Sequence, residues 1–224
     1  MINTQIDIGF YKTQYQSHNY VSIENWLDGE YSEKLHSHLY NMNPNWWFHS
    51  TTNNGMVNVR NFHYNETQIK ENEMLARKKL FNDEFSYIFW RTTGHGDSCK
   101  CVECIFKNDL ISAEYLTFIY QITGLRVDTT KEVFSSWYRP GNFLSIHSDA
   151  INGQLGFSYH LSKKWKPEYG GNLHLLTDSD IDRVVIPSFN TLNLFGLDSQ
   201  KAHFVSEVSV GVPENRYAIS GWWK

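Results

Sequence analysis

The sequence predicts a mainly β protein with supporting helices, and the distribution of its apolar residues carries this prediction. From about residue 131 to residue 224, short β-type segments follow one another, and turn residues such as Gly170-Gly171 separate them. Evenly spaced short strands of this kind are typical of a β-sandwich or barrel. Before residue 130, helical spacing prevails. We therefore expect one domain over residues 1–224, in which a helical and mixed half (about 1–130) supports a β core (about 131–224).

In the first half, apolar residues recur with the periods of both helices and strands. Leu27, Tyr31, Leu35 and Leu39 are spaced four residues apart, which places them on one face of a helix. A later helix should stop at Gly124, because glycine commonly ends helices in the left-handed conformation. The expected elements are a strand at 20–23, helices through 27–39, 66–81 and 110–124, and strands at 56–62 and 85–92.

The second half consists of strand-like segments with turn residues between them. No repeat and no low-complexity linker interrupts this half. The expected strands lie within residues 132–139, 142–149, 154–162, 171–177, 183–188, 191–195, 202–210 and 216–223.

Composition excludes several classes of protein. Aromatic residues make up 16% of the chain, as expected for a globular protein rather than a disordered one. The net charge of -4 argues against a nucleic-acid partner, which would select a basic surface. No apolar stretch approaches the roughly 18 residues that cross a membrane. Three cysteines are an odd number, and the chain starts without a signal-like segment, so we expect no membrane association and a cytoplasmic location.

One predicted strand carries a metal-ligand pattern. His147 and Asp149 are two residues apart, so a β conformation points both side chains to the same face. His203, in a later predicted strand, would complete a set of two histidines and one carboxylate, which suits non-heme Fe(II) but also zinc. The chain has 10 histidines, so a chance set remains an alternative, with His160 and His174 as core histidines.

An arginine lies at the start of the last predicted strand. Arg216 has an always-charged planar fork that matches a carboxylate. Burying it in an apolar strand is costly unless it is paired. Its partner is either an acidic residue of the protein or an incoming dicarboxylate.

The ordered motifs of the second half resemble a known family. They are "YRPGNFLSIHSD", "WKPEYGGNLHLL", "TLNLF", "HFVSEV" and "NRYAISGWW", between about Phe134 and Trp223, and "YVSIENWLDGEYSEKL" near the start matches as well. This part of the chain resembles the Fe(II)/2-oxoglutarate-dependent dioxygenases, particularly the prolyl-hydroxylase-like branch. The resemblance implies a double-stranded β-helix core, the jelly-roll or cupin-like fold.

The resemblance also implies roles for individual residues. His147, Asp149 and His203 would bind Fe(II), Arg216 would hold the distal carboxylate of 2-oxoglutarate, and the Tyr138 hydroxyl would contact the cosubstrate. O2 is the second cosubstrate, and ascorbate is a further suggested cofactor. The implied reaction couples oxidative decarboxylation of 2-oxoglutarate to C–H hydroxylation of an amino-acid-type substrate, free or within a peptide or protein.

Three other function classes stay open at this point. The first is an oxidative tailoring or demethylating enzyme that acts on a small metabolite. The second is a non-catalytic jelly-roll binding module, which the complete ligand set and Arg216 argue against. The third is a zinc-stabilised interaction protein built around the three cysteines. Arg139, beside the metal motif, is a candidate contact for a substrate carboxylate, with a surface salt bridge as the alternative.

All three cysteines lie in one segment outside these motifs. His95, Cys99, Cys101 and Cys104 could form a structural zinc site, because thiolates and imidazole are zinc ligands. The Cys-x-Cys step is tighter than in common zinc sites, so three reduced thiols in a loop are the alternative. We expect this segment to lie outside the dioxygenase motifs, with a lid over the substrate as one place for it.

Overall fold

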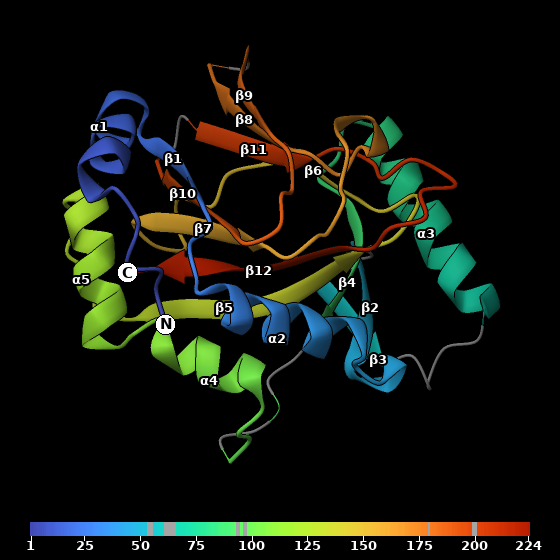
Figure 1. The fold of residues 1–224 in the computed structure, drawn as a ribbon. Helices are drawn as coiled ribbons and strands as arrows, with labels where there is room; N and C mark the ends of the chain where they lie inside the picture. Colours follow the sequence, from blue (N-terminus) through green and yellow to red (C-terminus); the bar gives the residue numbers. More distant parts are fainter. Residues whose placement is uncertain (53–55, 61–65, 93–94, 96–97, 179, 199–200) are drawn as a thin grey trace.

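A curled antiparallel sheet with helices on its outer face makes up the fold (Figure 1). The computed structural model describes residues 1–52, 56–60, 66–92, 95, 98–178, 180–198 and 201–224. The helices are α1 (Ile8–His18), α2 (Gly29–Tyr40), α3 (Glu66–Phe81), α4 (Val102–Asp109) and α5 (Ala113–Thr123). None of the helices in these ranges is long and apolar enough to cross a membrane.

The strands belong to one 12-stranded sheet with the order β1-β10-β7-β12-β5-β4-β6-β11-β8-β9, and β2 and β3 extend it beside β4. They are β1 (Tyr20–Glu24), β2 (Trp47–Thr52), β3 (Met56–Arg60), β4 (Tyr87–Thr92), β5 (Thr130–Tyr138), β6 (Phe143–His147), β7 (Leu155–His160), β8 (Leu173–Thr177), β9 (Asp180–Val185), β10 (Thr191–Gly196), β11 (Lys201–Val205) and β12 (Arg216–Trp223). Two strands of the first half pair with strands of the second, because β1 pairs with β10 and β4 lies between β5 and β6. The two halves therefore contribute to one sheet, and one domain over residues 1–224 stays a prediction.

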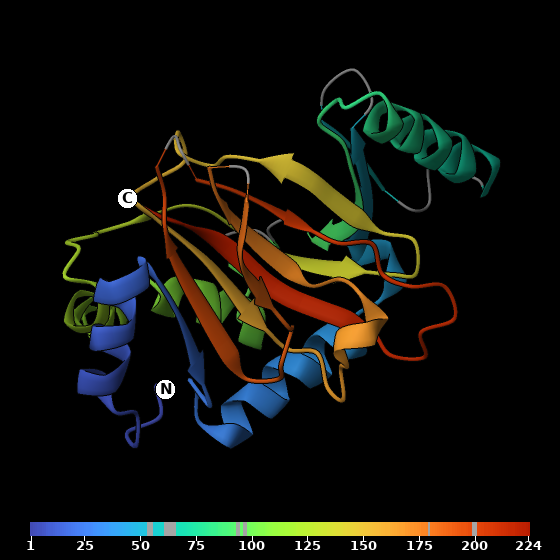
Figure 2. The same cartoon turned by 90° about the horizontal axis from the view of Figure 1, so that it is seen from above.

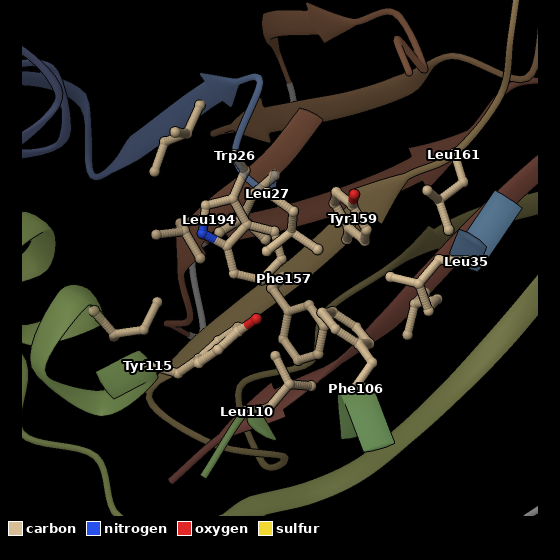
Figure 3. Close-up of a cluster of buried hydrophobic side chains, with 14 of the residues drawn as sticks. Trp26, Leu27, Leu35, Phe106, Leu110, Tyr115, Phe157, Tyr159, Leu161 and Leu194 are labelled. Atoms are coloured by element: carbon tan, nitrogen blue, oxygen red, sulfur yellow. The ribbon is translucent and has the colours of Figure 1, made fainter. Parts of the chain in front are cut away.

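The larger hydrophobic core lies between the sheet and helices α1, α2, α4 and α5 (Figures 1 and 2). Trp26 is fully buried at its centre, and its ring meets those of Tyr115 and Tyr159 edge-on at centroid distances of 5.6 and 5.0 Å (Figure 3). Each such side chain contributes about 1.5–3 kcal/mol by leaving water. This core holds β7, β10 and β12 in place from one side.

A second apolar cluster lies on the inner, concave face of the sheet. Phe89 of β4 stacks on Tyr138 of β5 with ring centroids 5.1 Å apart, and Leu173, Phe195 and Val205 complete the wall. Helix α3 stands apart from the other helices and contacts β2 and β4 (Figure 2). The concave face forms a cavity, and no residue of the described helices lines it.

The structure confirms the prediction of a mainly β protein with supporting helices. The predicted helix at 66–81 coincides with α3, and Gly124 ends α5 with a φ of 76°. Helices α1 and α4 were not predicted. In α1 only Tyr15 is buried, so its sequence shows little apolar spacing, and Asp7 fixes its start by accepting a hydrogen bond from the amide of Phe10.

Candidate active site

The pairing of β6 with β11 brings the two predicted histidine ligands together. His147 and His203 are direct partners in the antiparallel ladder, and their ring centroids are 4.2 Å apart. Asp149 follows two residues after β6 ends, and its carboxylate turns back to the same side. The three side chains therefore form one cluster whose ligand atoms lie within 4.8 Å of one another.

The ligand atoms of this cluster converge on one point. Asp149 Oδ2 lies 3.6 Å from His147 Nε2 and 3.3 Å from His203 Nε2. Two metal ligands at about 2.1 Å and at right angles lie roughly 3 Å apart, so these distances are close to those of ligands on one face of an octahedron. Such a facial set leaves three neighbouring positions open.

Neighbouring groups orient the predicted ligands. His147 Nδ1 lies 2.9 Å from the carbonyl oxygen of Ser145, which favours a proton on Nδ1 and leaves the Nε2 lone pair toward the cluster. Asn152 donates a hydrogen bond of 2.9 Å to Asp149 Oδ1, which leaves Oδ2 for a metal. Both contacts are typical of the support that metal ligands receive.

Burial and mutual charge favour the metal-binding protonation states. Although burial raises the pKa of Asp149, hydrogen bonds and charge from His147 and His203 outweigh it and hold that pKa well below its usual range. Burial lowers the pKa of His203, and Asp149 offsets part of this shift. An ionised carboxylate and neutral imidazoles are the forms that bind a metal. The donor set fits Fe(II).

Arg216 is a buried cation that faces the same cavity. It opens β12, directly opposite Tyr138 of β5, and is only 2% exposed. Its Nε donates to the carbonyl oxygen of Gly171 at 2.6 Å, and its Cζ lies 4.4 Å from the Tyr138 ring centroid. Within the described ranges, no carboxylate pairs with Arg216.

The charge of Arg216 survives this burial. Desolvation lowers its pKa to about 10, so it stays protonated at neutral pH. Burial raises the pKa of Tyr138 to about 12, so the phenol stays protonated as well and can donate a hydrogen bond. A fixed positive charge without an acidic partner, beside a hydroxyl donor, is suited to an anion that enters from outside.

The cluster and the arginine line a single cavity. Apolar side chains such as Phe89 and Leu173 form part of its wall, and the hydroxyl groups of Ser136, Ser158 and Ser220 add polar positions. Trp222 also lines the cavity. The cluster of predicted metal ligands at one place in the cavity and the buried guanidinium at another suit a small molecule with two acidic ends.

Another predicted site residue, Arg139, lies elsewhere. Arg139 does not line the cavity: it is exposed and stacks over Trp137 and Trp90, with its Cζ 5.2 and 5.6 Å from the ring centroids. Its predicted contact with substrate stays a prediction.

The cysteine segment is not a lid over this cavity. Helix α4 begins within it, and Glu103 of α4 accepts a hydrogen bond from Ser135, whereas the next residue, Ser136, lines the cavity. Successive residues of a strand face opposite sides, so the cysteines lie on the other face of the sheet. The expectation of a lid is therefore wrong.

Sequence reasoning missed two supporting groups. Asn152 lies three residues after Asp149, in a turn in which the backbone amide of Asn152 donates a hydrogen bond to the Asp149 carbonyl. This three-residue spacing was the one signal in the sequence for its role. The other group is the Gly171 carbonyl, which accepts the hydrogen bond from Arg216 Nε. The sequence indicated only a turn at Gly170-Gly171, and nothing in the local sequence connects this turn with β12.

Comparisons with known proteins agree with this geometry. Residues 133–224 match the sequence model of the 2OG-Fe(II) oxygenase superfamily. A relative in sequence is prolyl 3-hydroxylase OGFOD1 of Mus musculus, 27% identical over 121 residues. This match covers 51% of the chain but only 22% of that relative, so the chain spans less than a quarter of its length.

Solved structures share the fold. A Pseudomonas putida prolyl-4-hydroxylase superposes with a TM-score of 0.61 and 13% identity, covering 97% of this chain and 98% of that one. A Trichoplax adhaerens prolyl hydroxylase, in complex with a hypoxia inducible factor oxygen degradation domain peptide fragment, gives 0.63 and 17%, covering 96% and 88%. These structures confirm the predicted jelly-roll core.

Proposed function

We propose that the protein, whose residues 133–224 match the sequence model of the 2OG-Fe(II) oxygenase superfamily, is an Fe(II)/2-oxoglutarate-dependent dioxygenase that hydroxylates a C–H bond of an amino-acid residue. The family's cofactor and cosubstrates are Fe(II), 2-oxoglutarate and O2. When these are bound, 2-oxoglutarate is converted to succinate and CO2, with one oxygen atom of O2 entering succinate and the other entering the substrate as a hydroxyl group.

In this proposal, His147, Asp149 and His203 hold Fe(II). The Ser145 carbonyl and Asn152 fix the orientation of His147 and Asp149. Because all three ligands come from β6, the turn after it and β11, the paired strands set their separation before any metal arrives. The remaining open positions face the cavity, where cosubstrates can reach the metal.

The unpaired Arg216 carries the cosubstrate assignment. A buried guanidinium without a carboxylate partner leaves a charge that 2-oxoglutarate can neutralise through its distal carboxylate. The Gly171 carbonyl holds Nε, so the rest of the fork is free to bind the anion. Tyr138 is positioned to donate a second hydrogen bond, because its ring stacks beneath the guanidinium.

We propose a prolyl residue of a peptide or protein as the substrate class. The sequence relative is a prolyl 3-hydroxylase, and one structural neighbour holds a peptide. Beside the predicted metal ligands, the Phe85 ring lies 5.5 Å from that of His147 and is 47% exposed. An exposed apolar ring at this place suits a polypeptide better than a small polar metabolite. The three free cysteines agree with a cytoplasmic location, which we also propose.

Product analysis tests the proposal. Protein loaded with Fe(II) and 2-oxoglutarate without O2 is mixed with oxygenated buffer and a panel of proline-containing peptides, matched peptides with alanine in place of proline, and free amino acids. The proposal expects succinate above the substrate-free rate, and one added oxygen on proline, only with proline peptides. Asp149→Ala should give neither product. Coupled succinate with free amino acids alone would reject the peptide substrate, and no difference between wild type and Asp149→Ala would reject the reaction.

A further inference from the structure

A second cluster of metal-binding groups lies on the helical side of the sheet, away from the iron cavity. The thiols of Cys99, Cys101 and Cys104 and an imidazole nitrogen of His95 all lie within 4.8 Å of one another. None of these residues lines the iron cavity. From this geometry we propose a structural zinc site with three thiolate ligands and one imidazole.

The start of α4 places two of the thiols together. Cys101 is the N-cap of the helix and Cys104 is three residues further on, so both thiols lie at the start of α4, within 4.8 Å of each other. Cys101 offers no side-chain cap bond to the helix, so its sulfur is available.

The imidazole lies at a distance from the sulfurs that suits a metal between them. His95 Nδ1 is 3.2 Å from Cys101 Sγ and 3.6 Å from Cys99 Sγ. In a tetrahedral site with Zn–N of about 2.0 Å and Zn–S of about 2.3 Å, nitrogen and sulfur ligands lie roughly 3.5 Å apart. The cluster is therefore nearly at zinc-bound spacing.

The other imidazole nitrogen faces a buried carboxylate. His95 Nε2 lies 3.5 Å from Glu103 Oε2, and Glu103 is 0% exposed. A proton on Nε2 is favoured next to this carboxylate and leaves the Nδ1 lone pair toward the thiols. A carboxylate behind a metal-bound histidine is the usual means of fixing its tautomer and ring orientation.

Glu103 is itself held rigidly. Its Oε1 accepts hydrogen bonds from Ser135 of β5 at 2.6 Å and Thr92 of β4 at 3.1 Å, and Lys107 Nζ lies 2.7 Å away. Glu103 is thus a positioning residue that connects the proposed zinc site to the sheet. A zinc ion there would fasten the segment before α4 to strands β4 and β5.

A neighbouring set of groups is a weaker metal site. His38, His95 and Glu103 also cluster, with His38 Nε2 3.4 Å from Glu103 Oε2. The Lys107 ammonium already pairs with this carboxylate, so a second cation would be repelled. Three thiolates bind zinc more strongly than a shared carboxylate with imidazoles. The thiol side of His95 is therefore the preferred site.

Metal analysis of protein purified without added metal tests this site. The wild type and an Asp149→Ala/His203→Ala variant, which lacks the iron ligands, should both contain about one zinc per chain. A Cys99→Ser/Cys101→Ser variant should contain none. With Co(II) in place of zinc, only proteins with intact cysteines should show thiolate-to-cobalt absorption.

The role of Glu103 has its own readout. Glu103→Gln should weaken zinc binding by about 10–100-fold in competition with a chelator, while the exposed Glu71→Gln on α3 should not change it. Zinc that persists in the double cysteine variant but disappears from the double iron-ligand variant would overturn the proposal. The proposal would also be overturned if purified wild type contained no zinc and its thiols were alkylated, or oxidised to a disulfide, at the same rate with and without a chelator.

Discussion

His203 of β11 lies directly opposite His147 of β6, with the two ring centroids 4.2 Å apart. Backbone pairing, rather than a metal, brings the two rings together, and the neighbouring β8 continues the ladder from β11. The ligand cluster is therefore a property of the folded sheet. Loss of a ligand should affect metal binding without unfolding the protein.

Removal of a predicted iron ligand is the first test of this view. Asp149→Ala or His203→Ala should weaken Fe(II) binding by more than about 100-fold. Loss of a residue that only hydrogen-bonds to a metal ligand already lowers metal affinity by about 10–100-fold. Anaerobic Fe(II) titration measures this, and circular dichroism checks the fold. His174→Ala is the matched control, because His174 is another strand histidine that stacks on Phe204 outside the cavity. Wild-type Fe(II) affinity in both ligand variants would refute the triad.

The hydrogen bond from Asn152 should matter for metal binding. Asn152→Ala removes the donor to Asp149 Oδ1 and lets the carboxylate rotate, so Fe(II) affinity should fall by about 10–100-fold while turnover at saturating iron changes less. The exposed Asn82→Ala, after α3, serves as the control. An unchanged Fe(II) affinity in Asn152→Ala would show that the turn after β6 holds Asp149 without this contact.

Gly171 and Gly211 both have positive φ, so alanine substitutions at the two positions can distinguish backbone strain from a displacement of Arg216. A Cβ at Gly171 would lie 2.8 Å from Arg216 Cδ and 3.0 Å from Val208 Cγ2, whereas a Cβ at Gly211 meets nothing within 4 Å. Their φ angles are 62° and 85°, so alanine is strained by roughly 1–2 kcal/mol at either position.

Only Gly171→Ala should disturb the cosubstrate site. We expect it to lower both the melting temperature and the affinity for 2-oxoglutarate, while Gly211→Ala lowers the melting temperature alone. Thermal melts and 2-oxoglutarate titrations of the two variants measure this. Equal 2-oxoglutarate affinities would mean that the Gly171 turn does not position Arg216.

Strand periodicity explains how much of the site the sequence could predict. His147 and Asp149 lie on one face because their spacing matches the two-residue period of a strand. His203 faces these two residues because β11 pairs with β6. Only the ordered family motifs indicated this pairing. That no acidic residue of the described part of the chain pairs with Arg216 could not be foreseen, since tertiary packing determines which groups surround this side chain.

The cysteine segment was less predictable for a related reason. The segment from Cys101 to Asp109 is short and follows directly on the candidate zinc ligands, so α4 was not expected, although Val102 and Phe106 have helical spacing and pack into the main core. The role of Glu103 depends on Ser135 and Thr92, which come from two different strands. Local sequence shows the candidate ligands but not the carboxylate that orients one of them.

The pairing of Arg216 with 2-oxoglutarate is the central claim of this account. Removing the fork eliminates a charge-assisted bidentate contact worth on the order of 2–5 kcal/mol, or roughly 30-fold or more in affinity. Arg216→Lys should be intermediate, because it keeps the charge but loses the fork. Iron affinity should be unchanged, since other residues hold the metal.

Titration of 2-oxoglutarate under nitrogen into Fe(II)-loaded wild type, Arg216→Lys and Arg216→Ala, followed by the visible charge-transfer band of the iron complex, tests this most directly. The account predicts a dissociation constant that rises in that order, with folded protein and bound Fe(II) in all three. Equal affinities, together with a lower melting temperature of Arg216→Ala, would make Arg216 a structural residue and contradict the cosubstrate assignment.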